Sequence, residues 1–334
     1  MPDRVGLYLQ DSLSIQATLK IAQNAEMRGF DSVWQAEGRL SRDALVIVSA
    51  IATRTNRIRI GTAVVNIWTR HILALASSFL TLDELARERI LCGLGPWWDP
   101  LAIQAGVDRA KPLLAMRETI DVIRALLNGQ QVTFQGEFVR LDGLALEPGS
   151  ALRAARYIPI YMGVTGPRMT SLAGEIADGV LLNFMVSPHY NVGVMQQLEN
   201  GAQVAGRSLD TIDRPQLIMC SVDADRVRAL DAGRRIVTQY VRQQPRMMLA
   251  SGVPQRLIDE VTQVLPASFT RQQLEDATHL VPDEIVQLVM AAGTPDECRS
   301  KVREYIATGA TYPVLCPVGD SAERVIDVFA DGYS

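Results

Sequence analysis

The 334-residue chain is poor in the residues from which metal and disulfide sites are built. It has four cysteines, at positions 92, 220, 298 and 316, and no two of them form a CxxC pair. Its three histidines add no metal-ligand spacing, so we expect no structural zinc site and no bound metal. Cys92 and Cys220 lie in apolar, strand-like runs, which favours buried free thiols over reactive ones.

An excess of positive charge and long apolar runs are also missing. The chain has 33 Lys and Arg against 37 Asp and Glu, a net charge of −4, so it has no basic excess for binding nucleic acid. No apolar run reaches the ~18 residues of a membrane span, and the N-terminal MPDRVGLYLQDS lacks the apolar core of a signal peptide. We therefore expect a cytoplasmic protein with no nucleic-acid or membrane partner. A hydrophobic share of 48% is enough for one large core.

Short apolar runs alternate with segments of helical periodicity along most of the chain. Eight of these runs predict strands, at 5–9, 32–35, 58–65, 89–93, 157–162, 179–182, 215–222 and 312–317. The periodic segments predict helices, at 14–28, 43–54, 71–85, 111–127, 166–175, 189–205, 224–240, 295–308 and 321–329. This alternation predicts parallel strands with helical crossovers, and eight such units predict an α/β fold of the (β/α)8 TIM-barrel type, which needs about 250 residues.

Two segments interrupt this rhythm. Residues 132–141 alternate like an edge hairpin, and residues 241–282 are polar and rich in proline. We interpret the second segment as short helices inserted near the mouth of the barrel. The sequence therefore predicts a single barrel domain over residues 1–334, with an inserted helical segment at about 241–282.

The predicted strand ends carry the side chains that could act in catalysis or binding, because the active site of a barrel lies at the carboxyl ends of its strands. Tyr8 and Glu37 end or follow the first two strands, and Asn66 ends the third. The four tryptophans, Trp34, Trp68, Trp97 and Trp98, also lie at strand ends. They predict either a wide aromatic pocket or ordinary core and rim packing, and for Trp34 the two interpretations are equal.

Two glycine-containing turns follow strands. Residues 163–167, Gly-Val-Thr-Gly-Pro, connect a strand to a helix, and such a turn can present backbone N–H groups to an anion. A tight turn without a ligand is the alternative interpretation. Gly93-Leu94-Gly95 is followed by Pro-Trp-Trp, so it is not a dinucleotide-binding fingerprint.

Four segments resemble the luciferase-like superfamily: RIRIGTAVVNIWTR, TLDELARERILCGLGP, YIPIYMGVTGPRMTSLAGEIADGVLLN and AAGTPDECRSKVREYIATGA. Within it they are most similar to the methylenetetrahydromethanopterin reductases and their bacterial relatives, which use the deazaflavin coenzyme F420. The resemblance covers about residues 4–185 and 281–318. It implies a barrel whose third strand carries a bulge with a non-prolyl cis peptide, here Ala63–Val64, behind the cofactor ring.

The resemblance also implies a set of site residues. Gly163, Val164, Thr165 and Gly166 would hold the cofactor's phosphate or side chain, and Glu37 occupies the place of an acid that faces the ring. We therefore predict cofactor binding by Ala63, Val64, Asn66, Gly95, Gly163, Val164, Thr165 and Gly166, a substrate pocket with Trp68, Trp97 and Trp98, and proton handling by Glu37 and Tyr8.

The chain departs from the family pattern at three positions. The acid after the second strand is commonly an aspartate followed by histidine, whereas this chain has Glu37 followed by Gly38. Tyr8 stands where the methanopterin reductases carry a glutamate. Trp98 stands where they carry an aspartate, with Asp99 one place along. The scaffold and cofactor region thus match the family better than the substrate chemistry does.

Three functions remain open on the sequence alone. The first is hydride transfer between coenzyme F420 and a small carbonyl, imine or alkene substrate. The second is an FMN-dependent luciferase-like monooxygenase that works with a separate flavin reductase. The third is a non-catalytic, flavin-binding relative. We also expect a homodimer formed by helices near the second and third strands.

Overall fold

The computed structural model of the chain describes residues 3–38, 41–147, 157–319 and 321–334. Its residues group into two compact units. The N-terminal unit comprises residues 7–181 and 197–214, and the C-terminal unit comprises residues 1–6, 182–196 and 215–334. The long helix α7 (Pro188–Val204) carries the chain from one unit into the other.

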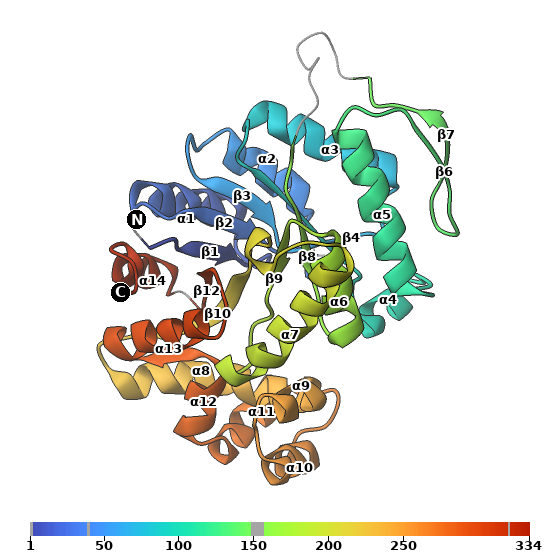
Figure 1. Cartoon of the computed structure of the whole chain (residues 1–334). Helices are drawn as coiled ribbons and strands as arrows, with labels where there is room; N and C mark the ends of the chain where they lie inside the picture. Colours follow the sequence, from blue (N-terminus) through green and yellow to red (C-terminus); the bar gives the residue numbers. More distant parts are fainter. Residues whose placement is uncertain (1–2, 39–40, 148–156, 320) are drawn as a thin grey trace. The chain divides into compact units, whose positions relative to one another are not determined.

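The N-terminal unit is built on a sheet whose successive strands are connected by helices, as the alternation predicts (Figure 1). The strand order is β1 (Gly6–Leu9), β2 (Ser32–Gln35), β3 (Arg59–Thr62), β5 (Ile90–Gly95), β8 (Ile160–Gly163) and β9 (Gly179–Leu181), with β4 (Val65–Asn66) paired to β5. The paired registers from β2 to β9 are parallel. The crossover helices are α1 (Ile15–Met27), α2 (Ala44–Ala52), α3 (Ile72–Leu85), α5 (Pro112–Leu127) and α6 (Pro167–Ile176).

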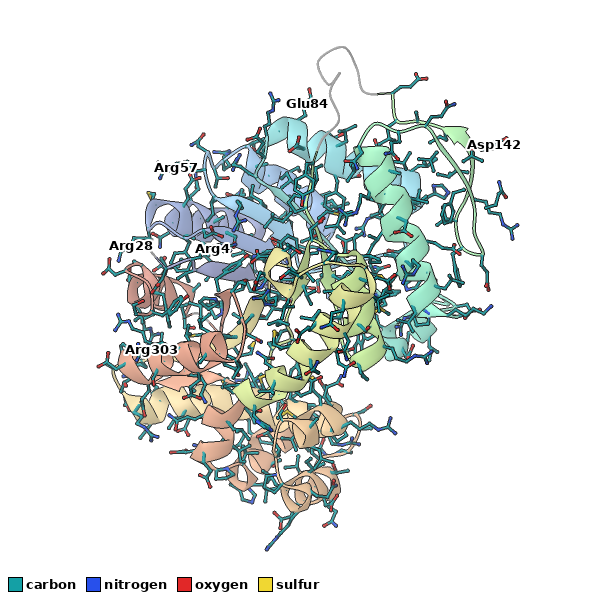
Figure 2. All side chains as sticks on the ribbon, in the orientation of Figure 1. Arg4, Arg28, Arg57, Glu84, Asp142 and Arg303 are labelled. Carbon is teal, nitrogen blue, oxygen red and sulfur yellow. The ribbon has the colours of Figure 1, made fainter. Side chains whose placement is uncertain are left out.

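Local sequence signals set the helix starts. Asp43 caps α2 by accepting hydrogen bonds from the backbone N–H groups of Leu45 and Val46. Proline stands in the first turn of both α5 and α6, where no hydrogen-bond donor is required. The buried residues of α2 and α5 face the sheet and neighbouring helices, whereas charged side chains such as Arg57, Glu84 and Asp142 point outward (Figure 2).

Trp34 lies in the core of the N-terminal unit and not at a strand mouth. Its side chain is fully buried, and its ring packs edge-on against Tyr161 with 5.1 Å between centroids. Gly61, its register partner on β3, makes this possible, because a Cβ there would lie 2.3 Å from the Trp34 ring. Of the two interpretations of Trp34, core packing and an aromatic pocket, the structure therefore supports core packing.

The predicted hairpin is confirmed as β6 (Val132–Gln135) and β7 (Arg140–Leu144), and it lies beside α5 (Figure 1). Glu118 of α5 holds its turn by accepting hydrogen bonds from the backbone N–H groups of Glu137, Phe138 and Val139. Burial alone would raise the pKa of Glu118, but these hydrogen bonds lower it below its usual value. The short helices α4 (Asp99–Gln104) and η1 (Leu209–Thr211) were not expected from the sequence.

The C-terminal unit contains the parallel strands β11 (Ala291–Gly293), β10 (Pro215–Val222) and β12 (Tyr312–Pro317), in that order. They pack with α8 (Arg226–Gln243), α13 (Pro295–Ala307) and α14 (Ala322–Phe329). A capping box between Thr294 and Glu297 begins α13. In the segment around residues 241–282 the predicted short helices are confirmed as α9 (Pro245–Ala250), α10 (Gln255–Val264), α11 (Arg271–Ala277) and η2 (Thr278–Leu280), followed by α12 (Asp283–Val289).

Each of the eight predicted strand runs contains a strand. The run 58–65 is interrupted after Thr62 and resumes at Val65, and β11 was missed because its three small residues carry little strand signal. The four cysteines are free and buried, as predicted for Cys92 and Cys220. Within the described ranges, no helix is long and apolar enough to cross a membrane. Those ranges also hold no cluster of His, Cys, Asp or Glu that could bind a metal ion.

Candidate active site

The peptide bond between Ala63 and Val64 is cis, as predicted. It lies between β3 and β4, and both residues are half-buried. The Val64 side chain packs between two glycines at the ends of neighbouring strands. A Cβ built on Gly95 would lie 2.4 Å from Val64 Cγ2, and a Cβ built on Gly163 would lie 2.9 Å from Val64 Cγ1. The structure therefore brings three of the predicted cofactor residues into contact.

Thr62 fixes the end of β3 before the cis peptide. Its hydroxyl donates to the carbonyl oxygen of Gly93 at 2.7 Å and accepts from the N–H of the same residue at 3.0 Å. Thr62 is fully buried. We did not single out this residue from the sequence, because threonine in a strand of branched residues carries no distinctive signal.

Asn66 organises the loop that follows β4. Its Oδ1 accepts hydrogen bonds from the backbone N–H groups of Trp68 and Thr69 and from the Thr69 hydroxyl, at 2.9–3.1 Å. The residue is buried, and its Nδ2 has no hydrogen-bond partner in the described part of the chain. Asn66 therefore has a donor left for a ligand.

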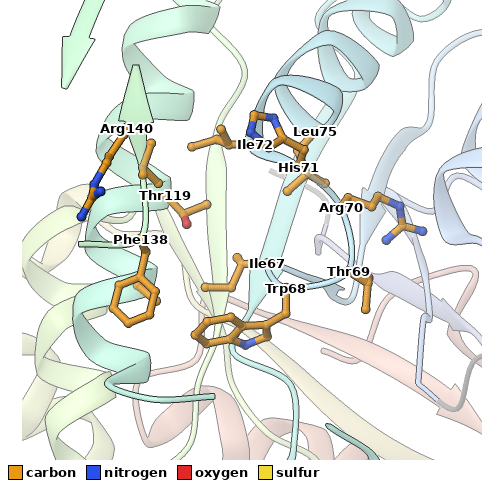
Figure 3. A pocket seen from close by; sticks show the side chains of 12 residues that line it. Ile67, Trp68, Thr69, Arg70, His71, Ile72, Leu75, Thr119, Phe138 and Arg140 are labelled. Carbon is orange, nitrogen blue, oxygen red and sulfur yellow. The ribbon is translucent and has the colours of Figure 1, made fainter. Parts of the chain in front are cut away.

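The three remaining tryptophans lie in different surroundings. Trp68 donates its Nε1 hydrogen to the carbonyl oxygen of Pro96 at 2.9 Å and lines a cavity of about 360 Å³ (Figure 3). Trp97 has a φ of +61°, and its buried indole nitrogen has no hydrogen-bond partner among the described residues. Trp98 is 40% exposed and precedes α4. Neither Trp97 nor Trp98 lines the cavity that contains Trp68.

Glu37 is held in an ion-pair network. Its two carboxylate oxygens accept hydrogen bonds from Nη1 and Nη2 of Arg70 at 2.8 and 2.6 Å, and Oε2 also accepts from the backbone N–H of Ala44. Arg70 Nη2 lies 2.7 Å from Asp43 as well. The hydrogen bonds with Glu37 raise the pKa of Arg70 above its usual value. Burial would raise the pKa of Asp43, but Arg70 lowers it.

Arg70 and Asp43 are functional candidates that our sequence reasoning missed. Arg70 follows β4 in the segment NIWTR, and an arginine so soon after a strand end was the available signal. Tyr8 is half-buried at the carboxyl end of β1. The adjacent ends of β1 and β2 are joined by a hydrogen bond from the N–H of Ala36 to the carbonyl oxygen of Leu9. Tyr8 and Glu37 therefore lie at the ends of neighbouring strands.

The Gly163–Gly166 turn joins a strand to a helix, which is the arrangement on which the predicted anion site depends. The strand β8 ends at Gly163, and Gly166, with a φ of +82°, precedes Pro167 at the start of α6. Thr165 and Gly166 are exposed, whereas Val164 is buried. No side chain caps the helix, so its first N–H groups remain available to an anion. Arg168 adds a positive charge here and lines a groove of about 540 Å³ beside α6.

Asp99 could have replaced the aspartate that the family carries after the fourth strand. In the structure Asp99 begins α4 and forms an ion pair with Arg109. Its side chain is 74% exposed, so it does not supply a buried carboxylate to the site.

Parallel strands joined by helical crossovers, with a glycine turn after β8, define an α/β protein whose strand ends are the candidate ligand site. The chain belongs to the luciferase-like monooxygenase family, whose model matches residues 1–312. It is 32% identical over 308 residues to the 5,10-methylenetetrahydromethanopterin reductase of Methanolobus tindarius, covering 91% of both chains. It is 28% identical to the F420-dependent glucose-6-phosphate dehydrogenase of Nakamurella multipartita, covering 93% of this chain and 89% of the relative.

Solved structures agree with this assignment. The coenzyme F420 dependent tetrahydromethanopterin reductase of Methanopyrus kandleri superposes with a TM-score of 0.88. The match covers 99% of this chain and 98% of that one, at 27% sequence identity.

Proposed function

We propose that this chain is a coenzyme F420-dependent oxidoreductase that transfers a hydride between the deazaflavin and a small organic substrate. One observation carries the proposal: Val64, after the cis peptide, packs between Gly95 and Gly163 at the strand ends. Relatives that match about nine-tenths of the chain are named for methylenetetrahydromethanopterin reduction and for F420-dependent glucose-6-phosphate oxidation.

The residues present fit this cofactor. Glycine at positions 95 and 163 leaves Val64 half-buried as an apolar support for a planar ring. The Asn66 amide and the partnerless indole N–H of Trp97 are two donors beside the same strand ends. The turn from Gly163 to Gly166, with Arg168, suits a phosphate. When bound, coenzyme F420 supplies or accepts the hydride, while the protein orients the reactants and manages the proton.

For the proton we propose Tyr8 as donor. A tyrosine hydroxyl can donate a hydrogen bond to an oxygen that gains negative charge. Glu37 was predicted to handle a proton, but both of its oxygens bind Arg70. We therefore propose that Glu37 acts mainly as a positioning residue that orients Arg70 near the strand ends.

We propose further that residues 1–334 form one closed (β/α)8 barrel, with residues 241–282 as an insertion, and that the protein is a cytoplasmic homodimer. The parallel strands and the crossover helices support the barrel, and the short helices α9–α11 support the insertion. A crystal structure and light scattering in solution would test these points. Two separate sheets, or a monomer at micromolar concentration, would contradict them.

The FMN-dependent monooxygenase is the second candidate, supported by the family's own description. A flavin activates oxygen, whereas a deazaflavin does so poorly because carbon replaces the reactive ring nitrogen. Titration of the purified protein with coenzyme F420 and with FMN, followed by visible spectroscopy, separates the two. Tight FMN binding without F420 binding would overturn the proposal, and cofactor binding with no turnover of any substrate would point to a non-catalytic relative.

A further inference from the structure

The cavity that contains Trp68 lies between α3, α5 and the β6–β7 hairpin, all in the N-terminal unit (Figure 3). Its volume of about 360 Å³ equals roughly twelve water molecules at ~30 Å³ each. Trp68 and Phe138 form one wall of it in edge-to-face contact, with 5.8 Å between ring centroids and an interplanar angle of 81°. Ile72 and Leu75 of α3 add aliphatic walls. The cavity therefore has the size and surface for a small ring or a short branched chain.

One polar group inside this cavity has no protein partner. Buried threonines in other helices, Thr18, Thr170 and Thr238, each donate their hydroxyl hydrogen to the carbonyl oxygen four residues earlier. Thr119 of α5 is equally buried, at 5% exposure, but its hydroxyl makes no such bond and has no other partner in the described ranges. Figure 3 shows the oxygen directed into the cavity. Because no described protein group engages this hydroxyl and it is accessible from the cavity, it can donate a hydrogen bond to a ligand there or accept one.

The charges around the cavity select against a cation. His71, Arg70 and Arg140 line it, and none of its lining residues in the described chain is acidic. Arg70 turns its guanidinium away from the cavity toward Glu37 (Figure 3). The lining thus combines aromatic and aliphatic side chains with the hydroxyls of Thr69 and Thr119 and with groups that are neutral or positive. An ammonium or iminium ligand would find no counter-charge there.

The cavity is fixed to the strand ends of the candidate active site. The Trp68 indole is hydrogen-bonded to Pro96, the residue after Gly95. The N–H of Ile67, another lining residue, donates to the carbonyl oxygen of Gly95 at 3.3 Å. Gly95 in turn contacts Val64. Two lining residues of the cavity are therefore hydrogen-bonded to the end of β5, the strand end that also contacts Val64.

We infer that this cavity is the subsite for the apolar body of the substrate, that it takes an uncharged cyclic alcohol, ketone or enone, and that Thr119 hydrogen-bonds an oxygen of that molecule. Its role as a substrate subsite rests on the proposed function, but binding to it does not. Because the hydroxyl selects for an oxygen and the walls select for ring size, Thr119 and Phe138 become specificity-determining residues.

The test measures binding of cyclohexanol, cyclohexanone and cyclohexylamine by calorimetry and saturation-transfer NMR, with and without coenzyme F420. Cyclohexylamine is a cation of matched size, so we expect it to bind at least tenfold more weakly than the other two. Thr119→Val should weaken cyclohexanol and cyclohexanone binding about tenfold, and Thr119→Ser should restore it. Ala115→Leu, which adds a side chain to the cavity wall, should abolish binding.

Thr238→Val is the matched control, because Thr238 is a fully buried helical threonine in the C-terminal unit whose hydroxyl is already bonded to Arg234. It should bind the ligands like the wild type. Unchanged binding in Thr119→Val and Ala115→Leu, or equal affinity for cyclohexylamine, would overturn the inference. Failure of F420-dependent turnover with intact ligand binding would instead refute the proposed function and leave the cavity assignment standing.

Discussion

Alanine at position 95 would place a methyl group where Val64 now lies. A Cβ built on Gly95 comes within 2.4 Å of Val64 Cγ2, whereas carbon atoms in contact normally stay about 3.5–4.0 Å apart. Gly95 is the last residue of β5, and its pairing with Asn66 of β4 limits how far its backbone can shift. We therefore expect Gly95→Ala to lower the free energy of unfolding by about 1–3 kcal/mol, the usual cost of overpacking.

The compensating change is Val64→Ala. Without the two methyl groups, the nearest atom of residue 64 to the new Cβ is the Val64 Cβ position, at an ordinary 3.5 Å. In this background Gly95→Ala should cost less than about 1 kcal/mol, which gives a coupling of about 1–2 kcal/mol in a double-mutant cycle. The double variant should regain stability without regaining F420 affinity, because the apolar support for the ring has been lost.

Urea unfolding followed by circular dichroism measures the free energy of unfolding of each variant, and fluorescence titration with coenzyme F420 measures its affinity for the cofactor. Gly193→Ala in α7 is the control: a Cβ there meets no atom within 4 Å, so the variant should be as stable as the wild type or more so by about 0.5–1 kcal/mol. A Gly95→Ala variant as stable as the wild type, or single changes that add without coupling, would refute this account of the site.

Three further predictions concern charge and proton transfer. Arg70→Met leaves the buried Glu37 carboxylate without its partner, so unfolding experiments should show a loss of about 3–5 kcal/mol, against almost none for the exposed Arg57→Met. Burial alone would raise the pKa of Glu297, but hydrogen bonds from Arg226 and Thr294 lower it from 4.5 to about 2. The stability from Glu297 is therefore present above pH 4.5 and lost as the pH falls toward 2, and Glu297→Gln should flatten this acid dependence of the melting temperature. Tyr8→Phe should slow F420-dependent reduction of cyclic ketones about 100-fold, whereas methylene-tetrahydropterin should be a poor substrate throughout; efficient pterin turnover that survives this change would contradict the substrate assignment.

Much of the architecture follows from local sequence patterns. Strands 32–35, 215–222 and 312–317 have the bounds that their runs predict, because a strand buried on both faces is mostly apolar. Helix starts follow from caps and prolines within one turn of the chain, as at Asp43 and Pro167. The cis peptide at Ala63–Val64 was placed through the family resemblance of GTAVVN and not through any local physical rule.

Only the tertiary structure decided which side chains meet. Trp34 shares its strand-end position with the other tryptophans, but the space beside Gly61 makes it a core residue. Glu37 forms an ion pair with Arg70, which lies 33 positions further along the chain. The sequence predicted Glu37 only as a proton-handling acid and gave no sign of this partner. Periodicity reports which face of an element is apolar, whereas contacts between strand ends and loops depend on how distant segments pack. The chemistry of this protein is set at such contacts, among them the open hydroxyl of Thr119 and the fit of Val64 between two glycines.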